Sequence, residues 1–235
     1  KNFIISLIAT LILGLIVGLI NSLIVTKGKI NSFITTLGTM AIIKGTTFVL
    51  TKAASIQNNY EGFDYLGTKN ILGIPIPVII FIVLCILVYY ILNFTVFGRN
   101  IYAVGGNANA ARLSGINVNK IKVLVFMIGG AFYALTAVIS ASRMNSGQPT
   151  AGIGFEMLVI SAVILGGVSM TGGRGNVLGV VMGILILNVL SNGLVLLNVS
   201  SFYQEIARGL VIIIAVLLDE NRKRNINKRL VQSKG

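Results

Sequence analysis

The 235-residue sequence lacks histidine and tryptophan, has one cysteine, Cys85, and contains only six Asp and Glu residues. Without histidine or a second cysteine the chain cannot support His-based catalysis, a zinc site or a dithiol redox centre. A disulfide framework is excluded for the same reason. We therefore expect no catalytic residue and no metal site in this chain.

Apolar residues are in large excess instead. The chain is 55% hydrophobic and 11% charged, with a mean hydropathy of +0.91, whereas soluble domains carry about 25% charged residues. The apolar runs do not alternate with period two, which leaves helices as the structures that can satisfy the backbone inside a bilayer. The sequence predicts an all-α fold, a polytopic helical bundle surrounded by lipid.

The formal net charge of +13 has two interpretations. In a soluble protein it would indicate a nucleic-acid partner. In a membrane protein, Lys and Arg accumulate in cytoplasmic loops and give the same total. The composition favours the second interpretation, so we expect no nucleic-acid partner.

The apolar runs predict about seven membrane spans, because a helix needs roughly 20 residues to cross a bilayer. Two of them are short: 155–170 ends in glycine, as a broken or half helix does, and 204–219 contains Arg208. The chain begins with Lys1, and its first span is too long for a signal peptide, so we expect an N-terminally truncated chain that forms one transmembrane domain, 1–235. The expected spans are 3–25, 30–50, 73–95, 121–142, 155–170, 176–197 and 204–219.

Loop charges predict the orientation of these spans. If the basic tail 220–235 is cytoplasmic, the loops lie on alternate sides of the membrane, and the loop 96–120 is then also inside. Most other basic residues fall on that same side. The C-terminus is therefore expected in the cytoplasm. The inside loops then contain Lys27, Lys29, Arg99, Arg112, Lys120, Lys122 and Arg174, and the outside loops contain Lys52, Lys69 and Arg143.

The loop 96–120 has the most specific local pattern. Gly105-Gly106 turns the chain, Asn107 stands at a helix-capping position, and an Ala-rich stretch ends at Gly115. We expect a short helix over 107–115. It could insert into a groove of a partner and pair Arg112 with a carboxylate; alternatively it is an ordinary interfacial helix with Arg112 at the lipid headgroups.

A glycine-rich stretch, 165–176, interrupts the late apolar runs. Irregular backbone is tolerated within the membrane only where protein or water covers it. Gly166, Gly167 and Ser169 could therefore form a bend near a pore. A tight turn between closely packed helices is the alternative. No Lys-Ser or Lys-Thr follows the glycines, which excludes a phosphate-binding P-loop.

Polar residues are rare in the spans. Asn188 and Asn192 share one helix face, where they could line a path for a neutral, hydroxyl-rich solute or hold two helices together. Lys44, Glu156 and Arg208 lie toward the ends of their segments, where a charged side chain reaches the interface cheaply. Gly14 and Gly18 are spaced for helix packing.

Several motifs in fixed order resemble the sugar-type permeases of ATP-binding cassette importers, in the branched-chain amino acid and monosaccharide permease family. Within it, the chain is similar first to ribose permeases and then to galactose/methyl-galactoside permeases. The motifs are 97–107 (FGRNIYAVGGN), 110–118 (AARLSGINV), 148–152 (QPTAG) with 154–156 (GFE), 165–169 (LGGVS), 172–175 (GGRG), 200–204 (SSFYQ) and 215–219 (AVLLD).

The resemblance implies a sugar translocation subunit of about ten spans, of which this chain would be the C-terminal part, in a bacterial cytoplasmic membrane. Its implied partners are a second permease copy, a cytoplasmic ATPase pair that holds ATP and magnesium, and an external sugar-binding protein. This chain would bind no cofactor. The implied coupling residues are Gly105, Gly106, Asn107, Ala110, Ala111, Arg112, Leu113, Ser114 and Gly115, and Asn188, Asn192, Gly166, Gly167 and Ser169 are candidates for the translocation path.

Overall fold

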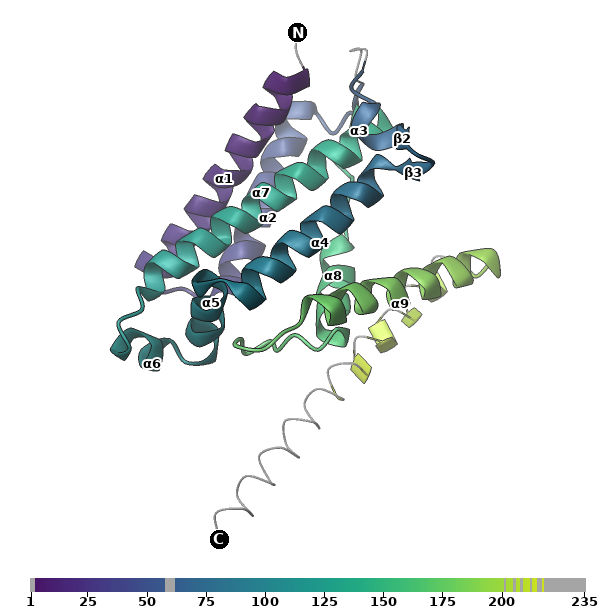
Figure 1. Cartoon of the computed structure of the whole chain (residues 1–235). Coiled ribbons are helices and arrows are strands. Elements are labelled where there is room, and N and C mark those ends of the chain that lie inside the picture. The colour runs from purple at the N-terminus through teal and green to yellow at the C-terminus, as the bar shows by residue number, and fades with distance from the viewer. Residues whose placement is uncertain are drawn as a thin grey trace. The chain divides into compact units, whose positions relative to one another are not determined.

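The structure is a computed structural model that describes residues 3–57 and 62–200, with several positions between 202 and 217 (Figure 1). The expected tail 220–235 lies outside the described residues, and so does much of the expected span 204–219. The chain forms two compact units. The first comprises 1–100 and 111–151, and the second comprises 101–110 and 152–235.

The elements follow the apolar pattern of the sequence. The first unit contains α1 (Phe3–Lys27), α2 (Ser32–Thr51), β1 (Ile56–Gln57), α3 (Tyr65–Thr68), β2 (Asn70–Ile71), β3 (Ile74–Pro75), α4 (Ile76–Phe94), α7 (Val118–Met144) and β4 (Ser146–Gly147). The second unit contains α8 (Phe155–Leu165) and α9 (Val177–Leu196). The helices α5 (Val96–Gly106) and α6 (Ala108–Leu113) each contribute residues to both units.

Five helices within the described part of the chain are long and apolar enough to cross a membrane: α1, α2, α4, α7 and α9. The expected span 155–170 is replaced by α8, an 11-residue helix of about 16 Å, which is too short to cross the apolar core. Its C-cap is Gly166, so the glycines end the helix before it reaches span length. The structure therefore shows five of the seven expected spans.

The core of the first unit is the contact between α1 and α7, which lie side by side (Figure 1). A Cβ atom added at Gly14 would meet the Gly130 carbonyl oxygen, and one added at Gly18 would meet that of Phe126. Backbones this close need glycine on the facing side. The expectation that Gly14 and Gly18 serve helix packing is confirmed.

The helix α2 packs more sparsely against α1. The Thr39 hydroxyl donates a 2.7 Å hydrogen bond to Oδ1 of Asn21, and Thr35 is buried in the same region. A hydrogen bond between side chains of two spans satisfies polar groups that lipid could not. This contact fixes which side of α2 faces α1.

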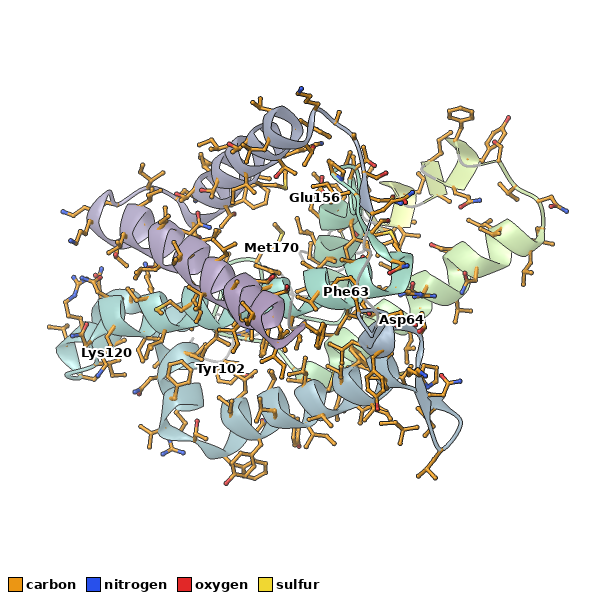
Figure 2. The ribbon with its side chains drawn as sticks, turned by 90° about the horizontal axis from the view of Figure 1, so that it is seen from above. Phe63, Asp64, Tyr102, Lys120, Glu156 and Met170 are labelled. Atoms are coloured by element: carbon orange, nitrogen blue, oxygen red, sulfur yellow. The ribbon has the colours of Figure 1, made fainter. Side chains whose placement is uncertain are left out.

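The loop between α2 and α4 folds onto the C-terminal end of α7. The Ser142 hydroxyl, fully buried, donates a 2.6 Å hydrogen bond to the Phe63 carbonyl oxygen, and Phe63 and Asp64 lie together there (Figure 2). Two antiparallel strand pairs, β1 with β4 and β2 with β3, complete this loop region. The prediction of a purely helical chain is correct for the spans but misses these short strands. A strand of two residues is too short to show the alternation of apolar and polar residues by which strands are recognised in a sequence.

The second unit is built on the contact between α8 and α9. A Cβ atom added at Gly166 would lie 2.6 Å from the Gly179 carbonyl oxygen, and one added at Gly183 would meet that of Ala162. Ala162 is fully buried, and Ile164 and Leu187 are buried as well. Small residues let the short helix sit directly on the backbone of α9.

Candidate functional site: a capped loop helix and a glycine junction

The helix α6 lies where the sequence predicts it and is fixed at both ends. At its start, Oδ1 of Asn107 accepts hydrogen bonds of 3.0 Å from the backbone N–H groups of Asn109 and Ala110. At its end, the N–H of Ile116 donates to the Ala111 carbonyl oxygen, and that of Gly115 donates to the Arg112 carbonyl oxygen, each at 3.0 Å. These two bonds form a Schellman motif.

Gly115 occupies the position that this motif requires to be left-handed, with φ of +83°. Immediately afterwards, Oδ1 of Asn117 accepts a 3.0 Å hydrogen bond from the N–H of Lys120 and so caps α7. The two caps leave little freedom between α6 and the following span.

The exposed tip of α6 carries an apolar and a basic side chain. Leu113 is 90% exposed and Arg112 is exposed beside it, whereas Ala111 is buried. The exposed side of α6 thus presents an apolar side chain next to a guanidinium group. The predicted coupling residues from Asn107 to Gly115 thus form one continuous structural feature.

The predicted coupling residues Gly105 and Gly106 end α5 and contact a different segment, the loop between α8 and α9. A Cβ atom added at Gly105 would lie 2.6 Å from the Gly173 nitrogen, and one added at Gly173 would lie 2.6 Å from the Gly106 nitrogen. The two glycine pairs therefore touch backbone to backbone. We call Gly105, Gly106, Gly172 and Gly173 the glycine junction.

A hydrogen bond reinforces the glycine junction. The Tyr102 hydroxyl, one turn before Gly106 on α5, donates at 3.1 Å to the Gly175 carbonyl oxygen (Figure 2). The sequence pattern identified both glycine motifs separately but did not predict their contact or the role of Tyr102. The only available signal was the position of this tyrosine three residues before Gly105-Gly106.

The loop at the junction is internally ordered. The N–H of Ser169 donates to the Arg174 carbonyl oxygen, and the N–H of Gly172 donates to the Ser169 carbonyl oxygen, each at 3.0 Å. The Ser169 and Thr171 hydroxyls are 2.8 Å apart. Because this loop starts at Gly166, which contacts α9, it connects the glycine junction to the α8–α9 pair.

The residues proposed for a translocation path do not form a single cluster. Asn188 and Asn192 are both exposed and share one face of α9, with the Asn188 amide donating to the Ile184 carbonyl oxygen at 2.8 Å. Gly166 contacts α9 at Gly179, about 13 Å along the axis from Asn188. The amide pair and the glycine loop, with Gly167 and Ser169, are two separate features, and their part in a path stays a prediction.

The described residues contain no group of three or more His, Cys, Asp or Glu side chains that could hold a metal ion. What they do contain is a set of apolar spans, a capped loop helix and a backbone junction between that loop and two further helices. These features define a multi-pass helical membrane protein with a rigid element exposed in one of its loops.

The chain belongs to the family described as branched-chain amino acid transport system / permease component, whose model matches residues 1–216. Members of this family are the transmembrane, non-catalytic components of their transport systems, without a bound cofactor. The family resemblance drawn from the sequence motifs is thereby confirmed.

The chain is similar to sugar permeases of several bacteria. It is 46% identical over 205 residues to the ribose import permease protein RbsC of Bacillus subtilis (strain 168), covering 86% of this chain and 63% of the relative. It is 48% identical over 203 residues to the RbsC protein of Haemophilus influenzae, covering 85% and 63%. It is 43% identical over 204 residues to the L-arabinose transport system permease protein AraH of Escherichia coli (strain K12), covering 87% and 62%.

The chain thus spans about 63% of the length of these relatives. No solved structure matches it with statistical significance.

Proposed function

We propose that this chain forms the membrane path of an ATP-driven importer of a monosaccharide, with ribose as its substrate. The observation that carries the proposal is the identity of 46–48% to two ribose import permeases over 85–86% of the chain. The similarity to an arabinose permease supports the broader class, a small neutral sugar. Galactose, methyl-galactoside, xylose or another small solute is the alternative substrate.

We propose that transport works by alternating access and that α6 couples it to ATP. ATP binding would close a cytoplasmic ATPase pair, whose movement would press on the exposed Leu113 and Arg112. The caps at Asn107 and Gly115 would keep α6 from unwinding under that load. A ligand or partner shifts such an equilibrium only through different contacts in the two states.

The glycine junction gives the movement a second route. A shift of α6 would also move the end of α5, and the contact of Gly105-Gly106 with Gly172-Gly173 would carry that shift to α8 and α9. Closely packed backbone has no soft side chains to absorb the displacement. Residues Gly166, Gly167 and Ser169 would then move with the coupling loop, beside a path that Asn188 and Asn192 help to line.

The proposed assembly contains two permease copies, two copies of an ATPase subunit that bind ATP and magnesium, and an external sugar-binding protein. The whole permease would have about ten spans, with seven membrane segments in this chain, one of them the half helix α8, and a cytoplasmic C-terminus, in a bacterial cytoplasmic membrane. The basic residues of loop 96–120 and of the tail support that orientation.

A proton- or ion-coupled secondary transporter is the rival function. That mechanism needs carboxylates at membrane depth. The five described spans contain no Asp or Glu. The rival therefore lacks its central element in this part of the chain.

The test is ATP-dependent uptake of labelled ribose, arabinose and galactose by the full-length permease, reconstituted with its ATPase and binding protein. Ribose uptake that requires ATP supports the proposal, and uptake without ATP contradicts it. The double variant Arg112→Ala/Leu113→Ala should lower sugar-stimulated ATP turnover at least about tenfold, the effect of losing an interface hot spot. Leu72→Ala, at a 98% exposed leucine outside this loop, is the matched control.

A further inference from the structure

Lys44 is the one charged residue in the interior of the five described spans. The other Lys and Arg residues of these helices, Lys27, Lys120, Lys122 and Arg143, lie within about one turn of a helix end. Lys44 lies seven residues before Thr51 and twelve after Ser32, about 10 Å along the axis from the nearer end. The sequence pattern suggested an end position for it, and the helix bounds place it deeper.

The direction of the side chain adds to this depth. In an α-helix every Cα–Cβ bond tilts toward the N-terminus. The stem of Lys44 therefore leaves the backbone toward the middle of α2 rather than toward the nearer end at Thr51. Reaching that interface would require the side chain to turn back along the helix, which makes snorkelling unfavourable here.

No span of the described part of the chain can neutralise this charge. Neither α2 nor any of the other four spans contains Asp or Glu. An unpaired ammonium group facing hydrocarbon is costly, and intramembrane charges face the protein interior or a water-filled cavity. Lys44 is exposed in the structure, so within this chain it is not enclosed by protein.

The same face of α2 carries hydroxyl groups. Thr36 lies eight residues before Lys44, and Thr47 and Thr51 lie three and seven residues after it, which places all three within about 80° of Lys44 around the helix. Their hydroxyls donate to carbonyl oxygens of the helix itself, at 3.0 Å for Thr36 and 2.8 Å for Thr47 and Thr51. With their protons engaged, the three oxygens remain as acceptors toward whatever faces them.

This face also points away from α1. The contacts with α1 are made by Thr35 and Thr39, and Thr35 lies about 180° round the helix from Lys44. The Lys44 face therefore combines one strong donor group and three acceptor oxygens with the apolar side chains of Phe33, Leu37, Met40 and Phe48, which lie within about 40° of Lys44. A neutral polyol needs both donors and acceptors, because each of its hydroxyls both donates and accepts.

We propose that the Lys44 face of α2, comprising Thr36, Lys44, Thr47 and Thr51, lines the aqueous path, hydrogen-bonds the hydroxyls of the passing sugar and repels cations. The proposal rests on the proposed importer function. A fixed positive charge in a pore is an electrostatic barrier to protons and metal cations. Such a barrier lets a neutral sugar pass while the membrane stays closed to ions.

Water access at position 44 is the first test, since it needs no transport activity. In a full-length permease whose cysteines, Cys85 included, are replaced, Lys44→Cys should react with a membrane-impermeant thiol reagent in proteoliposomes. Ile42→Cys, at nearly the same depth but about 200° round the helix, is the matched control and should stay unmodified. Protection of both positions overturns the proposal.

Transport and leak are the second test, in the reconstituted complex. Lys44→Met should lower sugar uptake about tenfold, the cost of losing a hydrogen bond to a charged group, and should raise the sodium and proton leak. Lys44→Arg should restore both, while Lys52→Met, at the helix end, should leave both unchanged. Full uptake and no leak in Lys44→Met, with an active wild type, contradicts the proposal; an inactive wild type instead contradicts the importer function.

If Lys44→Met does not assemble, Lys44→Gln keeps the test decisive, because it retains a hydrogen-bond donor but loses the charge. It should retain most of the uptake and show the cation leak. Absence of a leak in that variant rules out the electrostatic barrier.

Discussion

The α1–α7 contact and the glycine junction use glycine in different ways. In the α1–α7 contact, Gly14, Gly18 and Gly130 sit inside continuous helices and let them approach over several turns. At the glycine junction, Gly172 and Gly173 have φ of +89° and +74° and end regular structure altogether. Inside the helices glycine removes a side chain from the facing surface, whereas Gly172 and Gly173 also adopt the left-handed backbone of a turn.

The comparison predicts different responses to substitution in the two regions. The α1–α7 pair gains stability from close packing along its length, so it should respond to substitution mainly in stability. The glycine junction joins the loop helix to α8 and α9 through a few backbone contacts, so it should respond mainly in coupling.

The largest expected effect is on the α1–α7 contact. Gly14→Leu would drive a side chain into the Gly130 carbonyl oxygen and Ala134, and overpacking of this kind costs about 1–3 kcal/mol or more. The purified permease should lose about 5–10 °C in thermal midpoint. Gly45→Ala is the control, because its added Cβ meets nothing within 4 Å, and it should stabilise α2 slightly.

A substitution at the junction should separate coupling from stability. Gly173→Ala places a Cβ 2.6 Å from the Gly106 nitrogen and strains a left-handed residue. Sugar-stimulated ATP turnover should fall about tenfold in assembled complexes, a loss of about 1.4 kcal/mol of coupling. Gly152→Ala carries the same strain, with φ of +76°, but meets nothing within 4 Å. Equal turnover in the two variants would show that the contact itself is not used.

The tyrosine beside the junction should have a smaller effect. Tyr102→Phe removes the hydroxyl that donates to the Gly175 carbonyl oxygen, a bond worth about 0.5–1.5 kcal/mol. We expect coupling to fall about twofold to fivefold. The control is Tyr133→Phe, at a tyrosine that is 78% exposed on α7. A loss as large as that of Gly173→Ala would mean that the hydrogen bond, rather than the glycine contact, carries the movement.

The smallest effect belongs to the α1–α2 contact. Thr39→Val removes the donor to Asn21, and interhelical hydrogen bonds in membrane proteins average about 0.6 kcal/mol. The thermal midpoint should fall by about 1–2 °C. Thr46→Val is the matched control, because the Thr46 hydroxyl donates only within α2, to Ile42. A drop in thermal midpoint equal to that of Gly14→Leu would mean that the contact of α1 with α2 stabilises the protein as much as its contact with α7.

The spans and the loop helix could be predicted from the sequence, because their signals are local. Apolar runs of about 20 residues specify a span wherever they occur, as α1 and α9 show. Asn107 and Gly115 specify the ends of α6 through bonds to backbone groups only a few residues away. The segment 155–170 was expected to be short and to end in glycine like a half helix, and α8 indeed ends at Gly166 before it reaches the length of a span.

The tertiary structure alone decided which of these local elements meet. Gly105 and Gly173 are 68 positions apart in the sequence, and either glycine pair by itself is consistent with an ordinary turn. The two glycines touch only because the folded chain places the end of α5 beside the loop after α8. No sequence pattern within either segment predicts that placement. Likewise, composition places a lysine in α2, but its depth and direction follow from where the folded helix begins and ends.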